Sequence, residues 1–275
     1  MQSGTKNIFF IGVGNMGGAI LHALAESGYP AQSMFFYEPN EEQANKVAEK
    51  SKVEKISSIS IGLSKADVVF LCVKPQVFPK ISGNLSQLKN FDKNSVVVSI
   101  MAGVTLGALR GVFSTQEKNI QIVRAMPNIA VMAKKGTVAI ATDGVEENTL
   151  QTVESLFSKC ANTVRILESQ MDAVTGLSGS GPAFVFQFIE ALAMGGVKMG
   201  LPRDVAMKLA LSTVGGSTEM LRESGFNPGE LTANVCSPAG TTIAGIQELE
   251  NRAFRGTVMA AVEAAARRSA ELGRN

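Results

Sequence analysis

Residues 8–17 contain the feature that most restricts how this chain can fold: a short apolar run, Ile8–Ile11, followed by glycines at positions 12, 14 and 17. In the pattern G-x-G-x-x-G the first glycine permits a tight turn, and the second lets a pyrophosphate approach the backbone. The third lets the next helix pack closely on the strand, and the N-terminus of that helix attracts phosphate. A strand-to-helix junction of this kind predicts an α/β unit that binds a dinucleotide.

The residue that follows the second predicted strand bears on which dinucleotide is bound. Glu38 lies about 20 positions beyond Gly17, where a carboxylate accepts hydrogen bonds from ribose hydroxyls and repels a 2′-phosphate. This favours NADH over NADPH, although Asn40 could donate to a phosphate and Glu38 could instead be a solvated turn residue. The loop residues that we expect at the cofactor are Gly12, Val13, Gly14, Asn15, Met16 and Gly17.

The first part of the chain alternates β-rich runs with helical patterns, including helices over Glu41–Lys50 and Thr149–Ser158. This alternation predicts βαβ units and a parallel sheet with helices on both faces. The predicted strands are Ile8–Ile11, Ser33–Tyr37, Val68–Val73, Val96–Ile100, Ile120–Arg124, Thr137–Ala141 and Thr163–Ile166. Ligands of open parallel sheets bind beyond the carboxyl ends of the strands. We therefore expect two strand-end loops to flank the nicotinamide half of the cofactor, with Val73, Lys74, Pro75, Ala102 and Gly103 as the contacts.

The character of the sequence changes near Glu168, after which the pattern is helical almost to the end. A predicted loop, Thr175–Pro182, precedes five predicted helices: Ala183–Met199, Arg203–Glu223, Pro228–Val235, Thr242–Glu250 and Phe254–Leu272. We therefore predict an α/β Rossmann domain with a doubly wound parallel sheet over residues 1–167 and an all-α domain over residues 168–275. The helical part is rich in small residues and poor in bulky ones, so we expect a second subunit to complete its core, with a compact monomeric bundle as the alternative.

Composition and cysteine usage argue against several classes of protein. The formal net charge is only +2 and the chain has no Trp, which gives no case for a nucleic-acid or membrane-surface partner. The three cysteines, Cys72, Cys160 and Cys236, are too far apart for a disulfide framework or a zinc site. This cysteine usage favours a reducing, cytoplasmic setting and no metal site. The apolar run near the N-terminus is too short for a signal peptide, and no run reaches the length of a membrane span.

Acid–base side chains are scarce. The single histidine, His22, falls inside the first predicted helix and is expected to be a half-exposed helix residue. Without a His/Asp dyad or a metal cluster, a reduction catalysed here must need little help from protein acids and bases. A protonated imine meets that condition, because its carbon accepts hydride directly.

The segment Asn234–Gly245 (NVCSPAGTTIAG) interrupts the helical pattern with small and hydroxyl-bearing residues. Ser237, Gly240, Thr241 and Thr242 lead directly into a predicted helix, whose unpaired backbone N–H groups could form a socket for a carboxylate. The alternative is an ordinary helix cap, in which Thr241 or Ser237 satisfies the helix end and nothing is bound.

Several segments together resemble pyrroline-5-carboxylate reductases. They are Gly12–Gly17, Val73–Pro75, Arg124–Asn128, Asp172–Phe184, Gly195–Pro202 and Pro228–Glu250. The resemblance implies a Rossmann domain plus an all-α C-terminal dimerisation domain, and hydride transfer from NADPH or NADH to 1-pyrroline-5-carboxylate to give L-proline. It also implies a homodimer or a ring of dimers, in which the substrate loop meets the cofactor crevice across a subunit interface.

The same resemblance implies roles for individual residues. Thr242 would be the catalytic residue, its hydroxyl reaching the ring nitrogen, while Ser237, Gly240, Thr241 and Thr242 hold the substrate carboxylate. Ser178, Gly179, Ser180 and Gly181 would shape the facing wall of the substrate site. Asn128 would lie at the nicotinamide end of the cofactor site.

Two alternative functions remain at this stage. A β-hydroxyacid-type dehydrogenase shares the two-domain plan, but it would need a catalytic Lys or His in the helical domain, for which Lys198 is the candidate. A non-catalytic NAD(P)-binding redox sensor would keep the cofactor site and would need no second ligand site.

Overall fold

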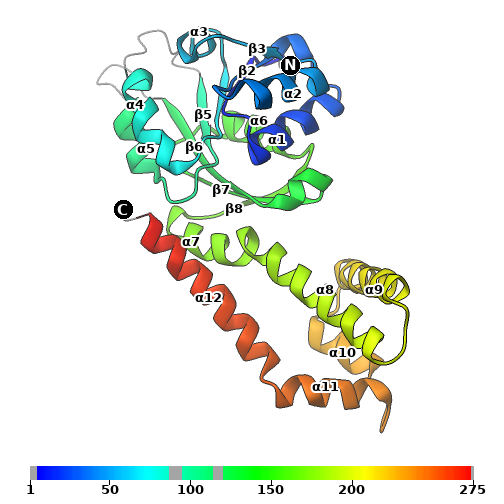
Figure 1. The fold of residues 1–275 in the computed structure, drawn as a ribbon. Helices are drawn as coiled ribbons and strands as arrows, with labels where there is room; N and C mark the ends of the chain where they lie inside the picture. Colours follow the sequence, from blue (N-terminus) through cyan, green and yellow to red (C-terminus); the bar gives the residue numbers. More distant parts are fainter. Residues whose placement is uncertain (1–4, 87–94, 114–119, 274–275) are drawn as a thin grey trace. The chain divides into compact units, whose positions relative to one another are not determined.

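The computed structural model describes residues 5–86, 95–113 and 120–273 (Figure 1). The chain forms two compact units, one made of residues 1–179 and 265–275 and the other of residues 180–264. The end of the last helix therefore belongs to the same unit as the sheet. The domain boundary that we place at residue 168 stays a prediction.

The first unit is built on an eight-stranded sheet with strand order β3-β2-β1-β4-β5-β6-β7-β8 (Figure 1). The strands are β1 Ile8–Ile11, β2 Met34–Tyr37, β3 Glu54–Lys55, β4 Val68–Leu71, β5 Val96–Ser99, β6 Gln121–Pro127, β7 Gly136–Thr142 and β8 Ala161–Arg165. The seven predicted strands are confirmed to within a few residues at their ends, and the two-residue β3 was not predicted. All neighbouring strands pair in parallel except β6 and β7.

One pair of strands in the predicted parallel sheet, β6 and β7, is antiparallel. Only residues 128–135 connect these strands, and they form a 3-10 turn, Ile129–Ala133. A parallel crossover needs a dozen or more residues, so this short connection forces the chain to reverse direction. The Rossmann fold class is confirmed, with one antiparallel pair near the β8 edge of the sheet.

Helices cover both faces of the sheet, as predicted. The helices of this unit are α1 Asn15–Glu26, α2 Glu41–Ser51, α3 Ile59–Leu63, α4 Phe78–Ser86, α5 Leu106–Phe113, α6 Glu147–Phe157 and α7 Met171–Val174. One core cluster packs α1, α2 and α6 against the sheet, and a second packs α3, α4 and α5 against the other face. The strand β1 is buried along its whole length, with Phe10 stacked on Phe70 at 4.9 Å between ring centroids. Such fully apolar central strands are typical of sheets covered on both faces.

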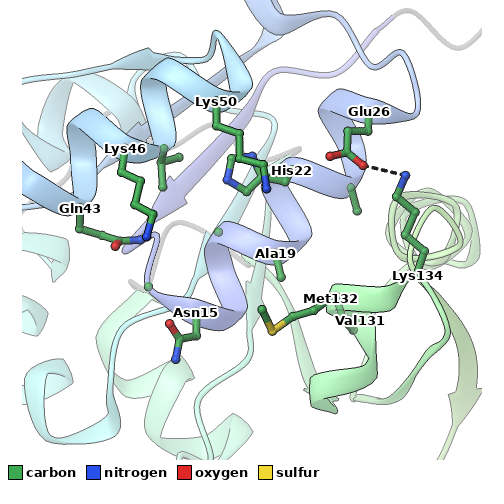
Figure 2. A pocket seen from close by; sticks show the side chains of 14 residues that line it. Asn15, Ala19, His22, Glu26, Gln43, Lys46, Lys50, Val131, Met132 and Lys134 are labelled. Carbon is green, nitrogen blue, oxygen red and sulfur yellow. Dashed lines mark ion pairs between the residues drawn. The ribbon is translucent and has the colours of Figure 1, made fainter. Parts of the chain in front are cut away.

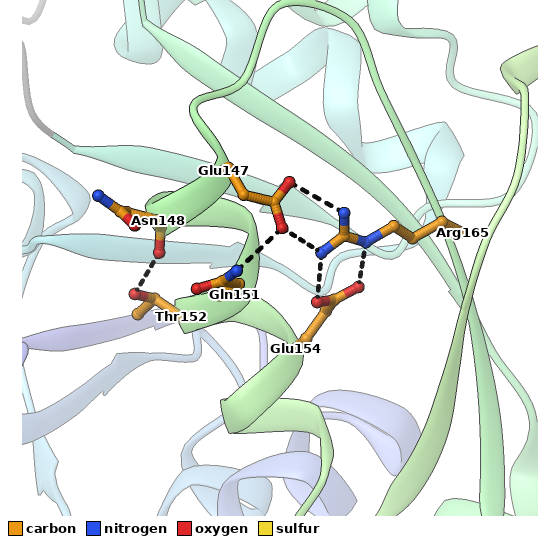
Figure 3. A network of polar contacts seen from close by, with 6 residues as sticks. All are labelled: Glu147, Asn148, Gln151, Thr152, Glu154 and Arg165. Carbon is orange, nitrogen blue, oxygen red and sulfur yellow. Dashed lines mark hydrogen bonds and ion pairs between the residues drawn. The ribbon is translucent and has the colours of Figure 1, made fainter.

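A surface ion-pair network fixes α6 to the edge strand β8 (Figure 3). The guanidinium of Arg165 binds Glu147 through two hydrogen bonds of 2.8 and 2.9 Å, and Glu154 through two more of 2.7 and 2.8 Å. The contact with Arg165 lowers the pKa of the Glu147 carboxyl. Because the network is exposed, we assign it a small contribution to stability and a role in holding the helix on the strand.

The second unit contains α8 Gly181–Lys198, α9 Arg203–Ser224, α10 Pro228–Val235, α11 Thr241–Asn251 and the first part of α12 Phe254–Leu272. All five predicted helices are confirmed. The buried apolar residues of this unit are three alanines, Ala193, Ala206 and Ala210. Large apolar side chains such as Phe186, Leu209 and Met259 are more than half exposed. A single chain therefore leaves this unit without a substantial core, which is typical of a surface that a partner covers.

Among the described residues, one helical stretch, Glu168–Lys198, is long and apolar enough to cross a membrane by length and composition, with a mean hydropathy of 1.2. Only 6% of that window is buried within the chain. A single stretch of this kind is weak evidence for a membrane span, because helices of soluble proteins pass the same criterion. Its exposed apolar side chains in α8 are part of the exposed apolar surface of the second unit described above.

The packing of α3 on β1 leads to a stability prediction. A Cβ added at Gly62 would collide with the ring of Phe9, which is fully buried. We expect Gly62→Ala to lower the free energy of unfolding by about 1–3 kcal/mol, although alanine is the better helix former. Gly107→Ala is the matched control, because its Cβ would lie in ordinary contact, 3.8 Å from Thr105 Oγ1. Urea denaturation of both variants measures the difference, and equal stability of the two would contradict the prediction.

Candidate cofactor and substrate sites

The loop between β1 and α1 has the geometry that the glycine pattern predicts. Gly12 has a φ of +89°, which favours glycine. A Cβ at Gly17 would lie 2.6 Å from both Cys72 Cβ and the Gly12 carbonyl oxygen, so only glycine permits this close approach of α1 to the sheet. The N-cap residue of α1 is Gly14, no side chain caps the helix, and no acidic residue lies in its first turn. The first N–H groups of α1 are thus left for an anion.

A cavity of about 340 Å³ lies beside this loop, at the carboxyl ends of β1, β2 and β4. It brings together five of the residues that the sequence predicts at the cofactor: Gly12, Gly14, Glu38, Val73 and Lys74. Its other walls include the apolar side chains of Ile59, Val77 and Ile81. A largely apolar cavity with a few polar groups at one end is suited to a flat, partly polar ligand such as an adenosine.

Glu38 is half-buried, and both of its carboxylate oxygens accept hydrogen bonds within the protein. Its Oε2 accepts a hydrogen bond from Val13 N at 3.1 Å, and its Oε1 accepts one from Asn40 N at 3.1 Å. Asn40 in turn caps α2 by accepting from Gln43 N. The carboxylate therefore connects the end of β2 to the phosphate loop.

Asn128, which the sequence predicts at the cofactor, lies next to Ser178, which the sequence predicts at the substrate; both belong to the first unit. Asn128 Nδ2 lies 3.5 Å from Ser178 Oγ, at the outer limit of a hydrogen bond, and Asn128 Oδ1 accepts from Thr137 N at 3.1 Å. Ser178 lies in a π-helical turn, Thr175–Gly179, between α7 and α8. The prediction of a loop over Thr175–Pro182 is therefore wrong: the helical hydrogen bonds continue with a wider turn, a feature frequent at functional sites.

The predicted strand-end residues Ala102 and Gly103 form a turn after β5. Gly103 has a φ of +76°, and a Cβ there would lie 3.2 Å from Gly273 Cα, just beyond α12. Ser269, near the end of α12, donates a hydrogen bond of 2.7 Å to Asp172 Oδ1. The end of α12 therefore contacts both the turn that follows β5 and helix α7, and no sequence pattern indicates either contact.

The predicted carboxylate socket forms the start of α11 in the second unit. The N-cap is Gly240, and no side chain caps the helix, so an ordinary cap by Ser237 or Thr241 is not what the structure shows. A Cβ on Gly240 would collide with Ser237 Oγ, and Ala239 adopts a left-handed φ of 57°. The turn therefore presents uncapped N–H groups beside the hydroxyls of Ser237 and Thr242. Ser180 and Gly181, at the start of α8, belong to this unit as well.

A second, smaller cavity of about 210 Å³ lies on the outer side of α1 (Figure 2). The side chains of Lys46 and Lys50 from α2 and of His22 from α1 line it, and the ion pair of Glu26 with Lys134 closes one end. His22 is half-buried, as the sequence predicts. Burial and the nearby charge of Lys50 lower its pKa.

A partly buried ion pair that no sequence pattern predicted lies on β6, where Arg124 is in register with Ser99, the last residue of β5. Arg124 is 7% exposed and donates to Glu168 Oε1 at 3.0 Å. The same oxygen accepts from Leu106 N at 2.7 Å, at the start of α5. Glu168 thus ties β6 and α5 to the segment that leads into α7. The only available signal was an arginine within an apolar strand.

The thiols differ in environment. Burial raises the pKa of the Cys160 thiol to about 11, and burial also raises that of Cys72, which lies under α1. Cys236 is half-buried beside the socket of α11.

Among the described residues no group of three or more His, Cys, Asp or Glu is placed to hold a metal ion.

The sheet, the glycine loop and the cavity at Glu38 define the first unit as a Rossmann-type dinucleotide-binding domain. Comparisons with known proteins identify the family. Residues 168–272 match the family model described as pyrroline-5-carboxylate reductase dimerisation, and residues 7–103 match that described as NADP oxidoreductase, coenzyme F420-dependent.

Relatives that match along nearly the whole chain indicate the same family. The pyrroline-5-carboxylate reductase of Synechocystis sp. is 41% identical over 266 residues, covering 96% of this chain and 97% of that protein. That of Corynebacterium melassecola is 37% identical over 271 residues, covering 98% and 99%. The solved structure of the Plasmodium falciparum pyrroline carboxylate reductase with NADP bound is 31% identical, with a TM-score of 0.85 over 98% of both chains. The chain therefore belongs to the pyrroline-5-carboxylate reductase family, whose members are oxidoreductases.

The lowered pKa of His22 predicts a pH dependence of stability. Because the folded-state pKa is below the unfolded value of about 6.5, the unfolded chain binds more protons in that range, and stability falls as the pH drops below it. We expect His22→Gln to flatten this decline, because glutamine does not titrate. Thermal unfolding of both proteins between about pH 5.5 and 8 measures it. The same slope for both proteins would show that His22 makes no such contribution.

Proposed function

We propose that this protein reduces 1-pyrroline-5-carboxylate to L-proline by hydride transfer from NADPH or NADH. The observation that carries the proposal is the uncapped start of α11, with the hydroxyls of Ser237 and Thr242, in a chain that also contains a dinucleotide cavity. Family membership supports the substrate. The scarcity of acid–base side chains supports an imine, whose nitrogen can arrive protonated.

The residues of α11 act by binding and orienting. The substrate carboxylate accepts hydrogen bonds from the backbone N–H groups at the start of α11 and from the hydroxyls of Ser237 and Thr241. The Thr242 hydroxyl bonds the ring nitrogen, which sets the face of the imine that is presented to hydride. Ser178, Gly179, Ser180 and Gly181 form the opposite wall. Holding both reactants in this way replaces acid–base chemistry with positioning.

The cofactor binds at the carboxyl edge of the sheet. Its pyrophosphate would lie on the N-terminus of α1, and its adenosine would lie in the cavity of Gly12, Gly14 and Glu38. Because Val73 and Lys74 line this same cavity, we assign them to the adenosine half and not to the nicotinamide half, where the sequence predicts them. Pro75, Ala102, Gly103 and Asn128 flank the nicotinamide half. When bound, the reduced nicotinamide supplies the hydride. The half-buried carboxylate of Glu38 repels a 2′-phosphate, which supports a preference for NADH over NADPH.

The proposal includes the assembly. Matching of residues 168–272 to a dimerisation family and the exposed apolar side chains of the second unit support a homodimer, which can associate further into a ring of dimers. In this dimer the α11 socket of one subunit and the cofactor crevice of another form one active site. The three separated free thiols support a reducing, cytoplasmic location.

The direct test is oxidation of NADH and of NADPH by the purified protein with pyrroline-5-carboxylate, followed by absorbance and by analysis of the product. We expect rapid oxidation with proline as product, and a kcat/KM for NADH at least about tenfold above that for NADPH. Equal values would contradict the role of Glu38. Oxidation with a 3-hydroxyacid couple instead of the imine would favour the β-hydroxyacid dehydrogenase, and dinucleotide binding without turnover would favour the redox sensor.

The role of Thr242 generates a second prediction for this site. Thr242→Ala removes the hydroxyl at the imine nitrogen, so we expect kcat/KM for the substrate to fall about ten- to a hundredfold while the Kd for NADH stays within about twofold. Thr242→Ser keeps the hydroxyl and should retain most of the activity. Thr218→Ala, in α9, is the matched control, because its hydroxyl only bonds the Val214 carbonyl within the helix. Full activity of Thr242→Ala would remove Thr242 from the mechanism.

A further inference from the structure

Both backbone groups of Val13, in the middle of the phosphate loop, form hydrogen bonds with side chains that follow β2, Glu38 in the connection to α2 and Gln43 in the first turn of α2. The carboxylate of Glu38 accepts from Val13 N at 3.1 Å. The amide of Gln43 donates from Nε2 to Val13 O at 2.7 Å. Val13 is fully buried, so water does not compete for these groups.

The two side chains that hold Val13 are themselves fixed. Gln43 N donates to Asn40 Oδ1 at 3.0 Å, and Asn40 N donates to Glu38 Oε1 at 3.1 Å. Glu38, Asn40 and Gln43 therefore form a closed set of hydrogen bonds around Val13, which we call the Val13 clamp. The side chain of Gln43 lies with Asn15 at the outer cavity of α1 (Figure 2), and Gln43 does not line the cavity of Glu38.

Peptide geometry gives the clamp a consequence for the ligand. In a planar trans peptide the carbonyl oxygen and the next N–H point in opposite directions. The bond from Gln43 to Val13 O therefore directs Gly14 N–H away from α2. Gly14 is the N-cap of α1, and as glycines it and Gly12 have more backbone conformations to lose on binding than other residues. Without the clamp, binding must also order these glycines.

We propose that Gln43 is a positioning residue for dinucleotide binding, acting through the Val13 carbonyl to pre-order the N–H groups that receive the phosphates. This inference rests on the proposed function only in requiring that the site bind a dinucleotide. Glu38 then has two roles, because the carboxylate that discriminates between cofactors also holds the phosphate loop. A substitution of Glu38 that admits a 2′-phosphate also releases Val13 N–H. We therefore expect such a variant to bind both NADH and NADPH more weakly, and not to switch its preference from NADH to NADPH.

The test is direct measurement of Kd for NADH and NADPH, by fluorescence titration of the intact oligomer. Gln43→Met keeps the length of the side chain and removes the donor, so we expect both Kd values to rise about three- to tenfold. The KM for the cofactor should rise equally, with kcat at saturating cofactor nearly unchanged, while Tm falls modestly because the buried Val13 carbonyl loses its donor. Gln151→Met is the matched control, because it removes only an exposed hydrogen bond from the Gln151 side-chain amide to Glu147 in α6. It should change neither Kd.

Two further variants separate positioning from a general structural role. Gln43→Lys retains an N–H donor of similar reach and should recover most of the affinity. In a double-mutant cycle, the changes in binding free energy caused by Glu38→Gln and by Gln43→Met should sum to more than the change in the double variant. Each single substitution removes a hydrogen bond to the same residue, Val13, so the second removal costs less.

The outcomes distinguish this inference from the proposed function. Unchanged Kd values in Gln43→Met, or a lower Tm and kcat at unchanged Kd, would overturn the role of Gln43 and leave the reductase intact. Weaker binding in that variant, in a protein that does not reduce pyrroline-5-carboxylate, would support the clamp and reject the reductase. A wild-type protein that binds neither dinucleotide would reject both.

Discussion

The close approach of α1 to the sheet at Gly17 is the contact on which the rest of the first unit depends. The helix reaches the Cys72 side chain and the Gly12 carbonyl at a distance that no Cβ would allow. Only at this distance does the N-terminus of α1 lie beside the ends of β1 and β4, where the larger cavity opens. The burial of the Cys72 thiol and the position of Val13 both follow from it.

The two candidate anion sites of this chain have the same construction. Both α1 and α11 begin at a glycine N-cap, lack a side-chain cap and carry no acidic residue in the first turn. Each leaves backbone donors for an anion, and the proposed function assigns a pyrophosphate to α1 and a carboxylate to α11. A site that binds an anion through peptide N–H groups needs few ionisable side chains, which is consistent with the scarcity of acid–base residues in this chain.

Local pattern was sufficient for much of this structure. The glycine spacing predicted the turn at Gly12, and the apolar runs predicted seven of the eight strands, because each depends on residues close together in the chain. The reversal at β7, the π turn at Ser178 and the hold of Gln43 on Val13 were not predictable in this way. They depend on how long a connection must be, or on which distant groups meet, and neither leaves a periodic signal.

The meeting of Gly103 with Gly273 has a consequence for biosynthesis of the chain. The turn after β5 is made early, but the backbone that packs on it arrives only with the end of α12, and the bond from Ser269 to Asp172 also joins residues 97 positions apart. Chains fold from the N-terminus as they leave the ribosome. The nascent sheet therefore keeps this turn uncovered until the end of α12, about 170 residues later, has left the ribosome, and a chaperone that shields the turn has that interval in which to act.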